Sequence, residues 1–495
     1  MENRTYRDMA DKEPWSLDRR NFLKVFTGGI VVFFSLDPYL EAQGGRGYPS
    51  DPNAYLKIGE DGRVTVFTGK VELGQGVVTS LAQMAADELG VTLESIDMIL
   101  GDTDLCPPDM GTFGSMSTRF FGPPLRAAAA EARAVLIDLG ALQLKAPAQE
   151  LAVEKGVVFV KADPTRRVNF AKLAAGQKIA RLVDRKAELK SVAEFQVMGK
   201  SFNRVDARAK VTGEAKYAGD IRLPDMLYGR VVHPPAHGAK LLKIDTSAAE
   251  KIPGVILVKE EGFIGVLHPD PETAEKAVMA VKAEFDVPKP AMDTDTIFDY
   301  LVQHAPEPRE GEKKGDLAEG EKASSSVFEH RYENGYGAHT PIETHTALAR
   351  IEGGKATVWA ATQIPFPTRQ EVATALGFPQ ENVRVITPFV GGGFGGKSSG
   401  SLHAVEAARL AKAAGKPVQV AWTRAEEFFY DNFRPAAVVK IKSGIDAAGK
   451  LKLWDYNVYF AGSRSAEQFY HVPNNVIRTY GGWRGPGADV HPFGV

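Results

Sequence analysis

The sequence contains a single cysteine, Cys106, among its 495 residues. One cysteine excludes an internal disulfide, a zinc site built from several thiolates and an iron–sulfur cluster held by this chain alone. A surplus of positive charge is also missing, because 60 Lys and Arg stand against 62 Asp and Glu. The charge balance therefore gives no sign of a nucleic-acid partner, and we expect none.

Long apolar runs are scarce as well. The longest covers residues 25–36 and contains two glycines, so it is shorter than the roughly 20 apolar residues that span a membrane. Such a run suits the h-region of a signal peptide. The segment Ser16–Lys24 directly before it contains the adjacent pair Arg19 and Arg20, which resembles a twin-arginine leader.

We therefore expect export to the periplasm, with membrane association if the leader is retained. The alternative for these residues is a basic amphipathic helix at the N-terminus.

The length suggests about three domains, at roughly 150 residues per domain. Hydrophobic residues make up 44% and charged residues 25% of the chain, which describes a globular protein and excludes wholesale disorder.

Apolar spacing predicts alternating strands and helices. Val77, Leu81, Met84, Ala85 and Leu89 lie on one face of a helix that Gly90 ends. The other expected elements are strands at 55–58, 63–68, 94–100, 357–362 and 383–387, and helices at 123–139, 272–282, 369–376 and 403–414. The stretch 291–326 is polar and charged, which predicts a surface linker.

Glycine is frequent, with 49 residues, and it clusters at 391–396. Residues 391–398 satisfy G-x-x-x-x-G-K-[ST] between a predicted strand and a predicted helix, the pattern of a P-loop. Against that interpretation, the best downstream candidate for a strand ending in a magnesium-binding aspartate, 451–455, is poor. The cluster also holds more glycine than a phosphate loop requires. Nucleotide binding remains an alternative.

Five motifs occur in a recognisable order. They are His339–His345 (HTPIETH), Trp359–Gln363 (WAATQ), Gly391–Lys397 (GGGFGGK), Arg424–Phe428 (RAEEF) and Trp483–Gly487 (WRGPG). Together they closely resemble the molybdenum-binding subunit of the xanthine dehydrogenase and aldehyde oxidase family. Residues 204–220 look like the start of that family's α/β hammerhead domain. The resemblance covers residues 57–145 and 200–495.

One difference in order is informative. Residues 72–79 and 112–118 resemble a cofactor segment that most relatives carry near the C-terminus, whereas here it precedes the hammerhead domain. With the twin-arginine motif, this order looks most like the isoquinoline 1-oxidoreductase β-subunit branch. The resemblance implies an α+β fold. Its expected segments are a twin-arginine signal at 1–45, a permuted cofactor-binding segment at 55–145, a connecting region at 146–199, the hammerhead domain at 200–290, a linker at 291–326 and the first part of the molybdopterin-binding domain at 327–495.

The resemblance also implies a molybdopterin cytosine dinucleotide, whose metal is held by the pterin dithiolene, so no protein ligand cluster is expected. Gly74–Gly76 stands at the start of a predicted helix, where free N–H groups favour anions. An ordinary helix cap is the alternative for such a loop. The implied cofactor contacts are Gly74, Gln75, Gly76, Gly114, Ser115, Ser117, Thr118, Gln363, Gly393, Phe394 and Gly395.

Three residues match positions near the metal in the family. Gln363 matches a glutamine that donates to a molybdenum oxo group, Phe394 a wall of the substrate pocket, and Arg484 an arginine that orients a carbonyl or anionic substrate. The alternatives are a polar surface glutamine and ordinary core packing for the phenylalanine. Cys106 is expected to be inert, and His233, His237, His339 and His345 are expected to be structural.

The glutamate that acts as general base in relatives has no counterpart before the last residue, Val495. We therefore expect either a second polypeptide that carries the rest or a gene fragment, and no activity of this chain alone. The resemblance implies a [2Fe–2S] partner subunit, with a c-type cytochrome as a further candidate. The expected reaction is oxidation of an aldehyde or N-heterocycle with water as oxygen donor. Ser398 counts against xanthine, because purine-oxidising relatives have a glutamate there. A non-catalytic remnant or binding protein of the same fold is the alternative.

Overall fold

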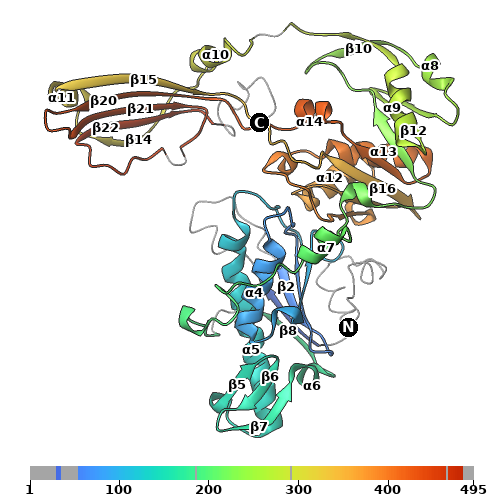
Figure 1. Ribbon diagram of the computed structural model, residues 1–495, viewed down its shortest axis with the longest axis vertical. Coiled ribbons are helices and arrows are strands. Elements are labelled where there is room, and N and C mark those ends of the chain that lie inside the picture. The colour runs from blue at the N-terminus through green and yellow to red at the C-terminus, as the bar shows by residue number, and fades with distance from the viewer. Residues whose placement is uncertain (1–28, 35–53, 184–186, 290–291, 464–465, 483–495) are drawn as a thin grey trace. The chain divides into compact units, whose positions relative to one another are not determined.

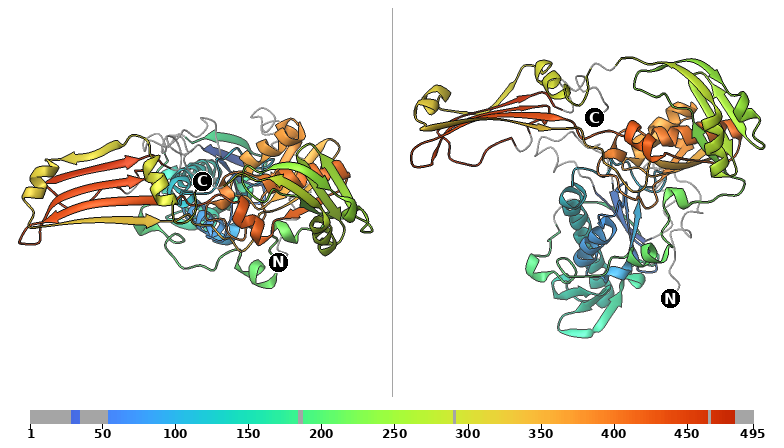
Figure 2. Two further views of the ribbon diagram at one scale, coloured as in Figure 1. Left: turned by 90° about the horizontal axis from the view of Figure 1, so that it is seen from above. Right: turned by 45° about the horizontal axis from the view of Figure 1, so that its top comes forward.

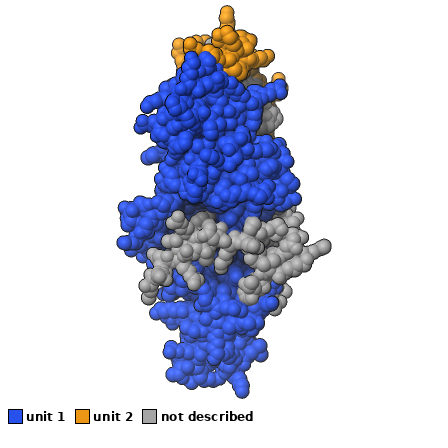
Figure 3. Space-filling view, turned by 90° about the vertical axis from the view of Figure 1, so that its right-hand side faces the viewer, with its two compact units in different colours: residues 1–232, 246–281, 341–423 blue, residues 233–245, 282–340, 424–495 orange. Residues whose placement is uncertain are grey.

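The computed structural model describes residues 29–34, 54–183, 187–289, 292–463 and 466–482. The paired arginines of the leader motif and Arg484 lie outside these ranges. The chain forms two compact units (Figure 3). Unit 1 comprises residues 1–232, 246–281 and 341–423, and unit 2 comprises residues 233–245, 282–340 and 424–495.

Unit 1 begins with a five-stranded sheet that has two helices, α4 (Val77–Leu89) and α5 (Gly122–Leu144), packed on it (Figure 1). In sheet order its strands are β4 (Ile96–Leu100), β3 (Val64–Thr68), β2 (Ala54–Ile58), β1 (Gly29–Phe34) and β8 (Lys178–Leu182). The strands predicted at 55–58 and 63–68 and the helix predicted around Val77 are confirmed, and Gly90 ends α4 with a φ of 71°.

Strand β1 lies inside this sheet, antiparallel to β2 and parallel to β8. Ile30 and Val32 belong to the core beneath α4 and α5, while Val31 packs with Tyr55 on the other face. All three aliphatic side chains are fully buried. The sequence predicts the h-region of a leader here, whereas the structure uses the same residues as a core strand. A strand buried on both faces is apolar throughout, as an h-region is, so composition does not distinguish the two.

The region at 146–199, expected to be a simple connection, has its own small sheet. Its elements are β5 (Leu151–Glu154), β6 (Val157–Val160), β7 (Asp163–Asn169) and the short helix α6 (Phe170–Ala174). Strand β8 then returns to the first sheet. The connection therefore contributes to the fold of unit 1.

A seven-stranded sheet completes unit 1, and it combines strands from the expected hammerhead and molybdopterin-binding segments. In sheet order these are β11 (Ile256–Glu260), β12 (Phe263–His268), β9 (Leu227–Val231), β19 (Val418–Ala421), β16 (Thr346–Glu352), β17 (Lys355–Ala360) and β18 (Val383–Ile386). The helices of this part are α7 (Ala207–Thr212), α8 (Ser247–Glu250), α9 (Pro271–Ala280), α12 (Pro365–Leu376) and α13 (Leu402–Ala414).

Main-chain hydrogen bonds and ion pairs join the two sheets of unit 1. Arg384 on β18 makes a buried two-point ion pair with Asp102 just after β4, at 3.0 and 2.6 Å. Lys355 on β17 donates to Asp104 at 2.6 Å. The ends of β4 and β18 are thereby held together beside the candidate site.

Unit 2 contains an open five-stranded sheet and a two-stranded sheet formed by β10 (Lys240–Asp245) and β13 (Lys282–Asp286). The larger sheet has the order β14 (Arg309–Lys314), β22 (Asn474–Tyr480), β21 (Leu451–Tyr459), β20 (Ala437–Ile445) and β15 (Ser326–Asn334). Helices α10 (Ile297–Gln303) and α11 (Leu317–Lys322) lie at opposite ends of its strands (Figure 2). Helix α14 (Arg424–Tyr430) also belongs to unit 2.

The expected linker at 291–326 thus contains α10, β14 and α11. Its charges are compatible with structure because β14 is an edge strand whose side chains are almost all exposed. Across the described ranges, no helix is long and apolar enough to cross a membrane.

Candidate functional site

Three segments of unit 1 meet at Gln363, which follows β17. The side-chain nitrogen Nε2 donates to the carbonyl oxygen of Thr112 at 2.7 Å, and the backbone N–H of Thr112 donates to the carbonyl oxygen of Gln363 at 2.9 Å. The side-chain oxygen Oε1 accepts from the backbone N–H of Gly395 at 3.1 Å. Gln363 is only 2% exposed. The alternative of a polar surface glutamine is therefore wrong, while the role of Gln363 toward a cofactor stays a prediction.

Glycine is required where these segments touch. A Cβ on Gly393 would lie 2.4 Å from Oε1 of Gln363, and one on Gly391 would lie 2.5 Å from Cβ of Glu343. A Cβ on Gly111 would lie 2.6 Å from the Ile364 side chain. The glycines therefore permit close approach of backbone to side chain, as the density of glycine suggested.

Lys397 has a structural partner in place of a phosphate. Its ammonium group is fully enclosed, and it donates to the carbonyl oxygen of Glu343 at 2.7 Å and to Oε2 of the same residue at 3.2 Å. The N–H of Gly391 donates to Oε2 at 2.7 Å. A P-loop lysine must reach a bound phosphate, so the literal motif match does not describe this loop.

Phe394 stands out from the loop. Its side chain is 73% exposed and its φ is 55°, a conformation that bulky residues seldom adopt. Ser115, in the loop that contacts Gln363 through Thr112, has a φ of 56°. Strained backbone of this kind concentrates at functional sites. The alternative of core packing for Phe394 is wrong.

A buried ion pair anchors the loop after β4. Lys70 donates to Asp109 Oδ1 at 2.9 Å and to the carbonyl oxygen of Gly111 at 2.8 Å, and both charged side chains are almost fully enclosed. The N–H of Val71 donates to Thr112 Oγ1 at 2.8 Å. These bonds hold residues 109–112 against the end of β3.

The turn before α4 already contains an anion. The carboxylate of Glu72, 5% exposed, accepts from the N–H groups of Gly74, Gly76 and Val78 at 2.9 to 3.0 Å. All three N–H groups lie at or just before the helix start, within residues 72–79, which resemble a cofactor segment. An incoming phosphate would have to compete with Glu72 for them.

Basic groups surround that carboxylate. Arg204 donates to Glu72 Oε1 at 3.2 Å and to both oxygens of Asp206, at 2.9 and 2.8 Å. Burial opposes ionisation of Asp206, but hydrogen bonds from Arg204 and Lys210 outweigh it and lower the pKa of Asp206 to about 2. Ion pairs therefore hold the turn against the start of α7.

The remaining predicted contacts fall in the same two loops. Gln75 uses its side chain within the turn, accepting from the N–H of Leu73 at 2.6 Å and donating to the carbonyl of Val71 at 2.9 Å. Ser117 is buried, whereas Thr118 is exposed and its Oγ1 lies 3.4 Å from Oγ of Ser80. Gly114 has a φ of 64°.

Three residues with important contacts were not predicted from the sequence. Glu343 lies within the quoted HTPIETH motif, so the motif itself was the available signal. Lys70 and Asp109 gave none, because a buried pair 39 residues apart in sequence has no local pattern.

The histidines and the cysteine have structural surroundings. The rings of His345 and His403 lie 4.8 Å apart, and Trp422 packs on both. Burial lowers the pKa of His403 well below its usual value, and burial raises the pKa of Cys106. His339 lies 3.2 Å from Asp431.

In the described part of the chain, no three His, Cys, Asp or Glu side chains form a metal-binding group. The resemblance implies a metal held by an organic cofactor. The junction around Gln363 fits such a group, because it presents glycine backbone, an exposed aromatic ring and a buried acceptor, Glu343 Oε1, without a hydrogen-bond donor among the described residues. The turn at Gly74–Gly76 fits less well while Glu72 fills it.

Family models match three parts of the chain. Models of the molybdopterin cofactor-binding domain match residues 21–218 and 303–490. A model of the aldehyde oxidase and xanthine dehydrogenase a/b hammerhead domain matches residues 212–262. One cofactor-binding segment thus precedes the hammerhead match and the other follows it.

Curated relatives are similar over most of the chain. It is 31% identical to a subunit of the nicotinate dehydrogenase of Pseudomonas putida, over 82% of this chain and 35% of the relative. It is 27% identical to the membrane-bound aldehyde dehydrogenase (pyrroloquinoline-quinone) of Gluconacetobacter polyoxogenes, over 90% and 60%. It is also 27% identical to the β-subunit of isoquinoline 1-oxidoreductase of Brevundimonas diminuta, over 87% and 62%. The chain spans between about a third and under two thirds of these relatives.

Proposed function

The chain belongs to the xanthine dehydrogenase and aldehyde oxidase family, and we propose that it forms the molybdenum-binding subunit, or part of it, of a molybdenum hydroxylase. The reaction would be oxidation of an aldehyde or an N-heteroaromatic compound with water as oxygen donor. The observation that carries this proposal is the junction where Gln363 joins the glycine loop to the loop of Thr112. The names of the relatives, which act on nicotinate, isoquinoline and aldehydes, support the substrate class.

The molybdenum cofactor, proposed here in its cytosine dinucleotide form, would supply the redox chemistry when bound. The described residues would position it. An amide nitrogen carries two hydrogens, and the bond to Thr112 uses one of those on Gln363, so the other remains for a cofactor oxygen. Phe394 would form an apolar wall for the substrate. Arg484 is proposed to orient the substrate on the strength of its motif alone.

The partners and the location are also proposals. One cysteine, buried with its pKa raised, cannot hold an iron–sulfur cluster, so electrons would leave through a [2Fe–2S] subunit and onward to a c-type cytochrome. A further chain is also proposed as a partner, since two of these relatives are named as subunits. The motif around Arg19 and Arg20 supports export to the periplasm. Because β1 is a core strand, the folded chain would keep its residues from Gly29 onward.

Molybdenum per chain, measured by elemental analysis on protein purified from its native compartment, tests the proposal. We expect about one atom per chain. Gly393→Ala should abolish it, because the new Cβ displaces the side chain of Gln363. Gly335→Ala is the matched control, since no atom lies within 4 Å of its Cβ position and its φ is ordinary.

Absence of molybdenum from the wild-type chain, in cells that load other molybdoenzymes, would refute the proposal. It would favour the second candidate, a non-catalytic protein of the same fold. The observation that favours this second candidate is Glu72, whose carboxylate already accepts hydrogen bonds from the N–H groups of the turn before α4. An equal molybdenum content per chain in Gly393→Ala and in the wild type would show that the junction around Gln363 is not the binding site.

A further inference from the structure

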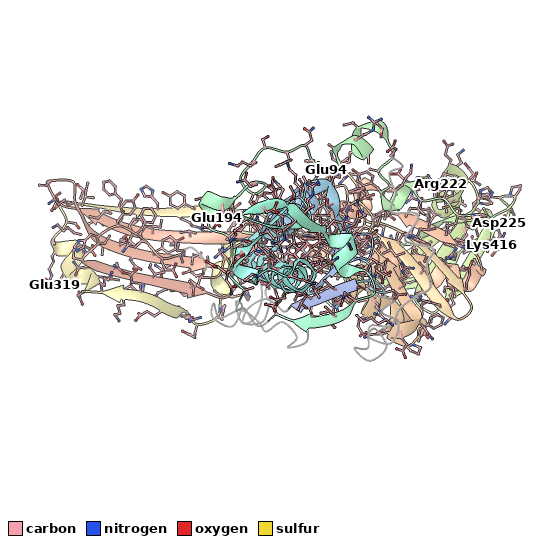
Figure 4. The ribbon with its side chains drawn as sticks, turned by 90° about the horizontal axis from the view of Figure 1, so that it is seen from below. Glu94, Glu194, Arg222, Asp225, Glu319 and Lys416 are labelled. Atoms are coloured by element: carbon pink, nitrogen blue, oxygen red, sulfur yellow. The ribbon has the colours of Figure 1, made fainter. Side chains whose placement is uncertain are left out.

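Strand β15 forms one edge of the five-stranded sheet in unit 2 and pairs only with β20 among the described strands. All nine of its residues, Ser326–Asn334, are exposed. Phe328 and Tyr332 are 45% and 57% exposed, which is unusual for aromatic residues in a strand. Figure 4 shows the side chains of this sheet projecting from its strands, with Glu319 of α11 at one end. The edge therefore offers a row of main-chain groups that another strand could pair with.

The opposite edge, β14, carries the features that prevent such pairing. Its register against β22 shifts between Glu310 and Lys313, and it contains Gly311 and two adjacent lysines. Bulges and lysines are common protections of edge strands. In β15 there is no lysine, proline or glycine, and its nine residues pair with β20 without a shift. Of the two edges, only β14 combines a register shift, a glycine and lysines, whereas the charges along β15 alternate in sign.

We propose that β15 is a homodimer interface. It pairs antiparallel with β15 of a second copy, around a two-fold axis that passes through His330, and the two five-stranded sheets become one continuous sheet. Because the same surface serves both partners, its sequence must be complementary to itself when reversed.

The sequence SVFEHRYEN meets that requirement. Around a two-fold axis at His330, Glu329 lies opposite Arg331 of the second copy, and Arg331 lies opposite its Glu329. Phe328 lies opposite Tyr332 in the same way. Opposite charges and aromatic pairs that face each other across strands stabilise the pairing. The side chains of each pair also share one face of the sheet, since positions 328 and 332, like 329 and 331, differ by an even number of residues.

Neighbouring registers are unfavourable, which makes the pairing specific. An axis at Glu329 places two glutamates opposite each other, and an axis at Arg331 places two arginines opposite each other and Glu329 opposite Glu333. Like charges directly opposite are destabilising. Of these three registers, only the one centred on His330 pairs all nine residues and opposes unlike charges.

The intrachain contacts of these residues are compatible with the dimer. Arg331 lies 2.7 Å from Asp299 and from Glu333, and Glu329 lies 3.3 Å from Lys442. A guanidinium group has five N–H donors, so Arg331 can keep both partners and gain a third. The cross-strand pairs therefore extend a charge network that exists in one copy.

Charge substitutions in the full chain test the register. Analytical ultracentrifugation over a concentration series should show a reversible dimer for the wild type. In a dimer of Arg331→Glu chains, positions 329 and 331 face each other twice and are both glutamate. In a dimer of Glu329→Arg chains, the same positions are both arginine. Each variant alone should weaken the dimer roughly tenfold or more, since two attractive pairs become repulsive.

Mixing the two single variants is the decisive step. In the mixed dimer every pair at 329 and 331 unites opposite charges, so an equimolar mixture should recover the wild-type dimer affinity. A role of these residues within one copy cannot produce recovery on mixing. The control is Lys313→Glu on the other edge, which should leave the dimer unchanged, and circular dichroism should verify that each variant is folded.

Three outcomes would overturn the proposal. A wild-type chain that stays monomeric to about 100 µM, well above the dissociation constant of a specific dimer, would show that β15 does not pair with a second copy. Dimers unaffected by either single variant place the interface elsewhere. Variants that remain apart on mixing contradict the register.

Discussion

The strand β1 provides a sharp test, because the same residues look like a leader in the sequence and a core strand in the structure. The change is Ile30→Ala. Ile30 is fully buried between β2 and β8 and packs in the core beneath α4 and α5. Removing this much of a buried isoleucine costs about 2–5 kcal/mol. If residues 25–36 were only a leader, the substitution would leave the folded chain equally stable.

Hydrogen exchange followed by mass spectrometry measures this locally. Among the described strands, β8 pairs only with β1, so protection of its amides at Lys178–Leu182 depends on β1 being in place. A loss of 2–5 kcal/mol corresponds to a fall in protection of roughly 30-fold to several thousand-fold. The intact mass of the purified protein should also show that residues from Gly29 onward are retained.

The matched control is Ile342→Ala, the same chemical change at a side chain that is 92% exposed. It should shift stability by less than about 0.5 kcal/mol. Protection of β8 that changes by less than about threefold in Ile30→Ala, below 1 kcal/mol, would refute the assignment of β1 to the core. A purified chain that begins after residue 34 would refute it as well.

Three further predictions concern buried groups. Arg384→Ala should destabilise unit 1 by about 3–5 kcal/mol in chemical denaturation, because it leaves the buried Asp102 without its partner; a cost below about 1 kcal/mol would contradict this. Cys106 should resist thiol reagents at pH 8 in the native protein and react fully in denaturant, since burial raises its pKa; rapid native labelling would show that the site opens. The hydrogen bond from His339 to Asp431 raises the pKa of His339 above 6.5, so the pair stabilises the fold fully below about pH 6.5 and loses this contribution as pH rises through the raised value. His339→Gln should remove that part of the pH dependence, and an unchanged stability profile would contradict the pairing.

Local patterns predicted the regular elements well and the long-range contacts poorly. The apolar spacing around Val77 and the stop at Gly90 place α4 correctly because both signals lie within the helix. The charged run at 291–326 looked like a linker because β14 belongs to an edge, where charge is compatible with a strand. The pairing of Lys70 with Asp109 has no local signal, since it depends on how a loop folds back on β3.

The glycine cluster at 391–396 has a local sequence pattern, but its function depends on a long-range contact. Its sequence fits a phosphate loop and a backbone cradle equally, and the two differ in where Lys397 points. That direction is set by Glu343, 54 residues away in the sequence, whose carboxylate and carbonyl hold the ammonium group. The choice between the two interpretations therefore rested on a distant residue inside another motif, and the order of the motifs carried information that the glycine pattern alone did not.

Glu72 sets a condition on how a ligand can occupy the turn before α4. Three N–H groups that would serve a phosphate are bound to this carboxylate, and Arg204 supports it from the side. A bound phosphate must either displace Glu72 or lie beyond it, against Arg204 and the exposed Thr118. Displacement would leave a carboxylate beside an anion and would be unfavourable unless Arg204 and Lys210 compensated both charges. The second arrangement requires no such exchange. An anion at the turn before α4 would then be held mainly by the side chains of Arg204 and Thr118, and only in part by N–H groups at the start of the helix.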